Sequence, residues 1–296
     1  MTFKYLTGGA AVCLLMACQA EAPKSETVTE TPVQETATVP TLETEWVLHE
    51  FDAPESLIPG TTPGTFYVSN VNGEGAAKDG NGYISIITDA GEWVEKDWVS
   101  GLNGPKGMAL MGGDLYVSDI DEVVRVNTET GEIVSKTPIE GAKFLNDVAA
   151  VSNSVFVSDS GSARIHTIID GEVAIFLEDD RLGGVNGLHP MGDQMLITTM
   201  SDGHLLRFNL KTADLTVIAS GMKNADGIAV LPGGEFIISS WPGELHHVRN
   251  GETTVILDTQ EEPVFMNDIF MDERGLFAPN WQPGTVRKMN VVLPAG

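Results

Sequence analysis

The sequence predicts an all-β fold, namely a six-bladed β-propeller with four-stranded blades. The first indication is a repeat with intervals of 40 or 41 residues, in which a polar residue opens a short apolar run at Lys106, Asn146, Asn186, Asp226 and Asn267. The second is the character of these runs, which are about five residues long, rich in β-branched residues and separated by Gly, Asn or Asp. A blade of a propeller has this length and this spacing of turns, whereas a helical repeat does not.

Each repeat supplies the strands of one blade. A second apolar run follows the first after a turn, and in successive units it ends at Asp119, Asp159, Thr199, Ser240 and Asn280. A third run with alternating residues comes next, and a fourth short run closes most units. An earlier unit begins at Glu55, ends its second run at Asn70 and carries an insertion before its third run, which brings the number of blades to six.

The last unit, which begins at Asn267, supplies only three strands. Residues 45–51 (EWVLHEF) have the apolar pattern of a strand, and we expect them to provide the missing outer strand of this blade. A ring closed in this way has no open sheet edge, and an open edge invites aggregation. The predicted propeller domain therefore comprises residues 45–296.

Residues 1–17 are predicted to be a lipoprotein signal peptide. Lys4 precedes a 12-residue apolar stretch, Leu6–Ala17, which is too short to span a bilayer and is typical of a signal sequence. The sequence LMAC at residues 15–18 resembles the bacterial lipobox, in which the Cys, here Cys18, becomes the lipidated first residue of the mature protein. Ordinary signal cleavage at a small residue is the alternative.

Residues 18–44 are predicted to be the lipidated Cys and a disordered acidic tether rich in Thr and Pro. The segment carries almost no large apolar side chains, so it cannot bury enough surface to offset its chain entropy. Gln19 follows the Cys, whereas an Asp there would be the usual signal for retention in the inner membrane. The expected location is therefore the bacterial cell envelope, with a lipid anchor in the outer membrane and the domain facing the periplasm.

Charge and cysteine content exclude several classes of protein. The 42 acidic and 17 basic residues give a formal net charge of −25, and this field repels phosphate backbones, so no nucleic-acid partner is expected. Cys13 and Cys18 both lie in the N-terminal apolar run, which excludes a disulfide framework and a cysteine zinc site in the domain. The expected partners are a small-molecule substrate and the membrane lipid, with a protein partner left open.

The candidate functional residues open the innermost strands. Because innermost strands line the axis of a propeller, six equivalent residues should converge on one mouth: Glu55, Lys106, Asn146, Asn186, Asp226 and Asn267. The residues that end the second runs return to the same end and would form a second ring: Asn70, Asp119, Asp159, Thr199, Ser240 and Asn280. Carboxylate and amide oxygens suit Ca²⁺, with Mg²⁺ or Mn²⁺ as alternatives. Asn and Asp are also favoured simply as turn residues, which is the competing interpretation.

From about residue 45 to the end, the chain resembles the gluconolactonase/regucalcin (senescence marker protein) family of six-bladed propellers. The resemblance rests on Glu55 in the sequence PESL, Asn186 in NGL and Asp226 in DGI, and on Asn146 in an N-D motif. It implies that Glu55, Asn186 and Asp226 hold one divalent metal. It further implies that Asn146 contacts the substrate directly or the metal through water.

The sequence departs from the family pattern at several points. The usual E-G-P-x-W motif is replaced by PESL, and the chain reads Lys143-Phe144-Leu145 where the sugar-lactone enzymes often carry an Arg. Lys106 places a cation at the mouth, where it would either neutralise Glu55 and weaken metal binding or stabilise a developing oxyanion. These differences leave the sugar-acid substrate unassigned.

The function that this pattern favours is metal-dependent hydrolysis of a lactone, a cyclic ester, at the central mouth. One divalent metal would polarise the carbonyl and activate a water, with Ca²⁺ expected first and Mg²⁺, Mn²⁺ or Zn²⁺ as alternatives. Asp226 would be ligand and general base, while Asn146, Lys106 and Asn267 would contact the substrate. The alternative is a non-enzymatic propeller lipoprotein that binds a ligand or a protein on the same face, because the fold alone does not choose.

Two tryptophans occupy matching positions after the second runs, in Trp241-Pro242-Gly243 and Trp281-Gln282-Pro283-Gly284. They either wall the pocket or anchor a rigid repeat turn. Other chemistries lack their motifs, because the sequence contains no G-x-S-x-G elbow and none of its six His has the spacing of an H-E-x-x-H zinc site.

Replacing Cys18 by Ser is expected to release the protein from the membrane, because the thiol is the atom that would carry the lipid. Fractionation of expressing cells measures the change. Cys13→Ser, in the same apolar run, is the matched control and should stay with the membranes. A Cys18→Ser variant that stays in the membrane fraction like the parent would contradict lipidation.

Overall fold

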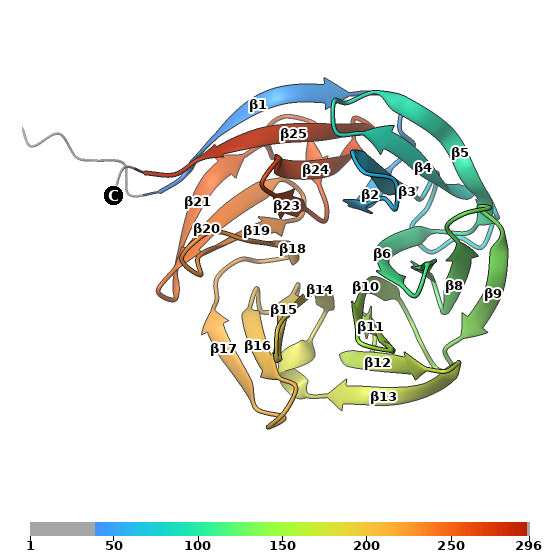
Figure 1. The fold of residues 1–296 in the computed structure, drawn as a ribbon. Coiled ribbons are helices and arrows are strands. Elements are labelled where there is room, and N and C mark those ends of the chain that lie inside the picture. Colours follow the sequence, from blue (N-terminus) through green and yellow to red (C-terminus); the bar gives the residue numbers. More distant parts are fainter. Residues whose placement is uncertain (1–38, 295–296) are drawn as a thin grey trace, which may run out of the picture. The chain divides into compact units, whose positions relative to one another are not determined.

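The computed structural model describes residues 39–294, which form six antiparallel sheets arranged in a ring (Figure 1). Each sheet is one blade, and in five of the six its four strands follow one another in chain order. The one helix in this range is a single 3-10 turn, η1 (Asp180–Leu182). The predicted six-bladed β-propeller is therefore confirmed.

The strands have the following bounds. Blade 1 consists of β2 (Pro54–Pro59), β3 (Thr65–Asn70), β4 (Gly82–Thr88) and β5 (Trp93–Leu102). Blade 2 consists of β6 (Pro105–Met111), β7 (Asp114–Asp119), β8 (Glu122–Asn127) and β9 (Ile133–Pro138). Blade 3 consists of β10 (Leu145–Val151), β11 (Ser154–Asp159), β12 (Arg164–Ile169) and β13 (Glu172–Glu178).

Blade 4 consists of β14 (Val185–Met191), β15 (Gln194–Thr199), β16 (Leu205–Asn209) and β17 (Leu215–Ala219). Blade 5 consists of β18 (Ala225–Val230), β19 (Phe236–Ser240), β20 (Glu244–Arg249) and β21 (Glu252–Asp258). Blade 6 consists of β22 (Phe265–Met266), β23 (Phe270–Asp272), β24 (Gly275–Gln282), β25 (Thr285–Val292) and β1 (Thr41–Leu48). In this blade the inner position is shared by the two short strands β22 and β23, which both pair with β24.

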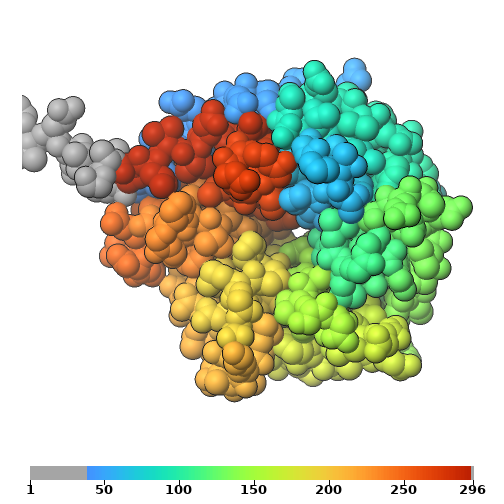
Figure 2. Space-filling view, viewed as in Figure 1, coloured from blue at the N-terminus to red at the C-terminus, as the bar shows by residue number. Residues whose placement is uncertain are grey.

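The hydrophobic core is divided among the contacts between neighbouring blades. Each of six clusters of buried apolar side chains draws its members from two adjacent blades. Aromatic rings fill several of these contacts, for example where Phe176 packs edge-on against Phe156 and Phe208 at 4.7 and 5.3 Å between ring centroids. The blades pack closely enough that the face in Figure 2 shows only a narrow gap at the centre. Every inner strand is thus held in place from both sides.

The N-terminal strand closes the ring, as the sequence predicts. Strand β1 pairs antiparallel with β25, with Thr41 opposite Val292 and Leu48 opposite Val286. It begins at Thr41, so it includes the last four residues of the segment 18–44 that we expected to be tether. The pairing ends at Leu48, and Phe51 is instead held by its own backbone N–H, which donates to the carbonyl of Gly284 at 3.1 Å.

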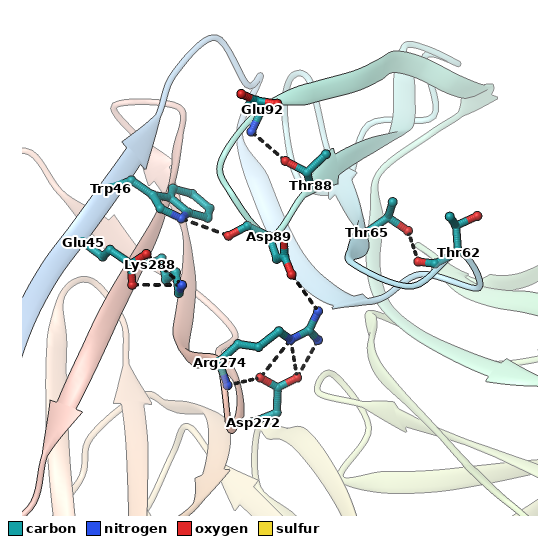
Figure 3. A network of polar contacts seen from close by, with 10 residues as sticks. All are labelled: Glu45, Trp46, Thr62, Thr65, Thr88, Asp89, Glu92, Asp272, Arg274 and Lys288. Atoms are coloured by element: carbon teal, nitrogen blue, oxygen red, sulfur yellow. Dashed lines mark hydrogen bonds and ion pairs between the residues drawn. The ribbon is translucent and has the colours of Figure 1, made fainter.

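Side chains from β1 and blade 6 also reach blade 1, as Figure 3 shows. Trp46 Nε1 donates to the carbonyl of Asp89 at 3.2 Å, and the indole lies so close to Gly91 that a Cβ there would come within 2.7 Å of the ring. Arg274 pairs with Asp272 and lies 3.8 Å from the carboxylate of Asp89. The closing strand is therefore tied to both ends of the ring.

The predicted signal peptide, Cys18 and residues 18–38 of the predicted tether lie outside the described residues. Among residues 39–294 there is no helix of the length and apolarity that crossing a membrane would need. Location in the cell envelope stays a prediction.

Trp46→Ala is expected to lower the free energy of unfolding by about 2–3 kcal/mol, because it removes a large ring that joins β1 to blade 1. Glu43→Ala, an exposed position on the same strand, should change it by less than about 0.5 kcal/mol and is the matched control. Denaturant titrations of the three proteins measure the difference. Equal stability of both variants would show that β1 does not support the closed ring.

Candidate functional site

The six predicted mouth residues lie at one end of the ring, each at or beside the start of an innermost strand. All are buried, with between 2% and 7% of their surface exposed. They line one pocket of about 350 Å³ together with Gly75, Phe144, Met200, Trp241 and Trp281. The structure thus brings together the complete set that the repeat spacing selects: Glu55, Lys106, Asn146, Asn186, Asp226 and Asn267.

A bulge at the start of the inner strand places these residues. In blades 1 to 5 the pairing of the first two strands loses register just there, for example between Leu145 and Val148 in blade 3. A bulge leaves a backbone group unpaired and re-aims the side chains around it. In four blades a hydroxyl on the second strand accepts the freed N–H at 2.8 or 2.9 Å: Ser56 to Ser69, Asp147 to Ser158, Gly187 to Thr198 and Gly227 to Ser239.

One of these hydroxyls, that of Thr198, also reaches the next blade, and so does the hydroxyl of Ser118 in blade 2. Thr198 Oγ1 donates to the carbonyl of Asp226, and Ser118 Oγ donates to the carbonyl of Asn146. The hydroxyl of Thr198 therefore fixes the bulge of its own blade and the backbone of the neighbouring mouth residue, Asp226. Sequence reasoning missed these residues, although a signal exists, since a Ser or Thr stands before the last residue of the second run in YVSN, YVSD, FVSD, ITT and ISS.

The predicted second ring requires a correction. Its residues do lie at the mouth end of the sheets, but among the described residues none of them lines the pocket. Two of them, Asp119 and Asp159, instead hold the loop that leads into the inner strand of their own blade. The carboxylate of Asp119 accepts from the backbone N–H groups of Asn103 and Gly104, and that of Asp159 accepts from those of Lys143 and Phe144. Strand pairing predicts at which end of the sheet a residue lies. Whether its side chain faces the pocket or a loop depends on the loops around it.

Two buried carboxylates face the pocket. Burial raises the pKa of Glu55 well above its usual range, and the charge of Asp226 adds to this shift while Lys106 opposes it. Burial also raises the pKa of Asp226, which the charge of Asp268 raises further and a hydrogen bond from Asn186 lowers. The site therefore concentrates negative charge in a place where that charge is poorly solvated.

Two further carboxylates lie one residue deeper on the inner strands. Asp147 accepts from the backbone N–H of Leu188 at 2.6 Å and so joins blade 3 to blade 4. Asp268 accepts from Ser56 Oγ at 2.7 Å and so joins blade 6 to blade 1, and burial raises its pKa to about 6. The N-D sequences at 146 and 267 thus combine a pocket residue with a cross-link between blades. Burial also raises the pKa of Asp147.

The Nζ of Lys106 is bound by backbone carbonyls and forms no ion pair with a carboxylate of the described residues. Its Nζ donates to the carbonyls of Gly75 at 2.9 Å and Gly104 at 3.0 Å, and it lies 4.5 Å from the centroid of the Phe144 ring. Burial lowers its pKa, against the charges of Glu55 and Asp119. In the part of the chain that the structure covers, no carboxylate oxygen lies within 4.0 Å of Nζ. Lys106 therefore leaves the carboxylates available, and one of its three N–H groups remains for a ligand.

The oxygen donors of the mouth fit a hard cation. Asn186 Oδ1 is a buried acceptor with no hydrogen-bond partner anywhere in residues 39–294, and it stands beside Asp226. An unpaired buried oxygen costs free energy unless a ligand satisfies it. In the same residues no three His, Cys, Asp or Glu side chains converge closely enough to form a metal site by themselves. A cation here would need the amide oxygen of Asn186 as well as the carboxylates of Glu55 and Asp226.

Comparisons with known proteins support the fold. No protein family and no curated protein matches the chain by sequence. Among solved structures, virginiamycin B lyase from Staphylococcus aureus, in a catalytically inactive form with quinupristin, is 14% identical with a TM-score of 0.60 and covers 86% of this chain and 100% of its own. A candidate gluconolactonase is 16% identical with a TM-score of 0.59, covering 87% of this chain and 94% of its own. A chain of the nidogen–laminin complex is 11% identical with a TM-score of 0.56, covering 86% and 94%.

Thr198→Val keeps the shape of the side chain and removes the hydroxyl that pairs with Gly187 and Asp226. We expect a loss of about 1–3 kcal/mol in stability, because two buried backbone groups lose their partner. Thr254→Val, on exposed surface in blade 5, should change stability by less than about 0.5 kcal/mol. Thermal and urea unfolding measure both. A Thr198→Val protein as stable as the control would contradict the role of this hydroxyl.

Proposed function

We propose that this protein hydrolyses a lactone in the mouth pocket with the help of one divalent metal. The observation that carries the proposal is the unpaired, buried Oδ1 of Asn186, which lines the same pocket as the carboxylates of Glu55 and Asp226. A hydrolase or lyase role also agrees with the propeller fold of the gluconolactonase candidate and of the lyase. The identities to these proteins are low, so the argument for the reaction rests on the residues of the pocket.

Glu55, Asn186 and Asp226 would hold the metal, since two carboxylates and an amide oxygen are the donors that Ca²⁺ prefers. Mg²⁺, Mn²⁺ and Zn²⁺ are the alternatives. When bound, such a cation polarises an ester carbonyl and makes water more acidic. It would also compensate the charge that burial makes costly at Glu55 and Asp226.

The remaining roles follow from the hydrogen bonds of the mouth. Asp226 is the proton acceptor for the attacking water, because its carboxylate lines the pocket beside the other oxygen donors. Asn267 Nδ2 is engaged with the carbonyl of Pro54, and Asn146 Nδ2 with Ser160 Oγ. Their amide oxygens are the groups offered to a substrate. The third N–H of Lys106 is the donor for the oxyanion that develops as the ring opens.

The pocket favours hydrolysis over the reaction of the lyase. The lyase is catalytically inactive when one of its His is replaced by Ala. No His lines the mouth pocket among the residues that the structure describes. The carboxylates of Glu55 and Asp226 can accept a proton there.

The competing function is binding of a ligand or a protein at the same mouth without chemistry. A chain of the nidogen–laminin complex has the same fold, so such a propeller can be part of a protein assembly. A lipid anchor on Cys18 in the cell envelope is compatible with both functions.

Asp226→Asn is expected to lower the rate of lactone hydrolysis by about 10²–10⁴-fold while the fold is kept, because it removes a proton acceptor and a negative ligand. The measurement is turnover of a panel of lactones during titration with Ca²⁺, Mg²⁺, Mn²⁺ or Zn²⁺, with elemental analysis and a thermal melt of each protein. Glu55→Gln should weaken metal binding and retain some turnover at high metal concentration.

Asp202→Asn, at an exposed turn after β15, is the matched control and should behave as the parent. A folded Asp226→Asn protein that hydrolyses lactones at the parental rate would overturn the mechanism. Absence of turnover with every lactone and metal, in a protein that still binds a ligand at the mouth, would establish the binding function instead.

A further inference from the structure

The mouth pocket has a second, apolar part that the proposed reaction does not use. Four side chains line it beside the polar ring: Phe144, Met200, Trp241 and Trp281. We call these four residues the aromatic wall. They belong to blades 3, 4, 5 and 6 in that order, and these blades are neighbours in the ring (Figure 1). We call this distribution of the four residues the arc.

The repeat explains why three of them share a position. Met200, Trp241 and Trp281 each follow directly on the residue that ends the second run of its blade. The same position is Ser160 in blade 3, where Phe144 from the loop before β10 supplies the apolar surface instead. Apolar side chains at equivalent positions of blades 4, 5 and 6 indicate that these positions form an apolar surface of the pocket.

The wall is held rigidly before any ligand arrives. Trp241 packs edge-on against Trp281 at 6.2 Å and against Phe265 at 5.4 Å between ring centroids. Its backbone N–H donates to the carbonyl of Asn224 at 3.0 Å, and Asn224 Nδ2 returns a hydrogen bond to the carbonyl of Trp241 at 3.1 Å. A preorganised surface loses little conformational freedom on binding.

The loop between β3 and β4 closes the gap between the two ends of the arc. A Cβ at Gly75 would lie 3.7 Å from the Trp281 ring and 4.0 Å from the Phe144 ring, so the backbone of this loop passes close to both. The carbonyl of Gly75 is fixed by Lys106 Nζ, which also lies over Phe144. Lys106 thereby connects the polar ring to the wall.

The chemistry of the wall selects against hydroxyl groups. Its rings and thioether offer a polyhydroxylated substrate no acceptors beyond a weak sulfur, and each Trp has a single N–H to donate. Hydroxyls placed there would lose water without gaining partners. An alkyl or aryl substituent would gain roughly fourfold in binding for each CH₂ group that it buries.

We propose that the aromatic wall is the binding subsite for an apolar alkyl or aryl substituent of the substrate, whose lactone ring lies over the polar residues. The position of the lactone ring over the polar residues rests on the proposed hydrolysis. The apolar subsite does not depend on that proposal. The substrate class is thus a lactone with an apolar side chain, in place of a sugar lactone.

The test compares three δ-lactones with the same six-membered ring. They are δ-valerolactone, the derivative with a pentyl chain on the carbon beside the ring oxygen, and glucono-δ-lactone. We expect kcat/KM to be at least about 30-fold higher for the pentyl lactone than for the other two. Trp281→Ala and Met200→Ala should reduce this preference about tenfold or more, and Trp281→Phe should restore most of it. Ser201→Ala, an exposed neighbour of Met200, is the matched control and should keep the parental preference.

A second measurement separates the subsite from the reaction. The δ-lactam with the same pentyl chain resists hydrolysis, so its binding is followed by quenching of tryptophan fluorescence. Saturable quenching that Met200→Ala weakens supports the subsite even when no lactone is turned over, in which case only the proposed hydrolysis fails. Turnover of glucono-δ-lactone as fast as that of the pentyl lactone, with no saturable binding of the lactam, would overturn the subsite and leave the hydrolysis standing.

Discussion

The site depends on one repeated hydrogen bond, in which a hydroxyl of the second strand accepts the backbone N–H that the bulge of the first strand sets free. Ser69, Ser158, Thr198 and Ser239 each make this contact. The bulge leaves a buried donor, which the hydroxyl satisfies in these four blades. Blade 2 has the same bulge, and there Ser118 Oγ instead donates to the carbonyls of Gly107 and Asn146.

Blade 6 lacks this hydroxyl. The equivalent residue is Pro279, which has no hydroxyl, and the inner strand is split into β22 and β23. Asp268, between the two parts, is fixed by Ser56 of blade 1. In blade 6 the segment that carries the mouth residue is therefore fixed by a hydroxyl of blade 1 and not by one of its own second strand. These contacts couple the geometry of Asn267 to the junction between blade 6 and blade 1.

Much of the fold could be predicted because each blade is a local unit. In blades 1 to 5 each strand after the first pairs with the preceding strand in the chain, so a spacing of 40 or 41 residues locates five of the six mouth residues, from Lys106 to Asn267. Glu55 lies further from Lys106, because the first unit carries an insertion, and is found from the strand pattern of that unit. The start of β1 at Thr41 could not be predicted, since Thr41 and Glu43 lie in a polar segment and owe their conformation to pairing with β25. The site prediction is limited for the same reason, because some residues of the site owe their position to contacts with other parts of the chain.

The roles of Asp119 and Asp159 depend on the conformation of loops. The alternation of side chains along a strand, which the sequence pattern shows, does not specify that conformation. The wall was foreseen only in part, at Trp241 and Trp281, because these have matching positions in the repeat. Phe144 lies before an inner strand and reaches the pocket only because the loop ahead of β10 is held by Asp159. A contact of this kind appears when the loop is seen in three dimensions.

A ring of equivalent blades needs some asymmetry to orient a substrate, and this chain provides it by dividing the residue types around the axis. Blades 1 and 2 contribute the charged groups Glu55 and Lys106, whereas blades 3 to 6 contribute the apolar arc. Asp226 is the exception, since it adds a carboxylate from blade 5. A substrate that is polar at one end and apolar at the other therefore has one favourable orientation in the mouth, with its polar end over Glu55, Lys106 and Asp226.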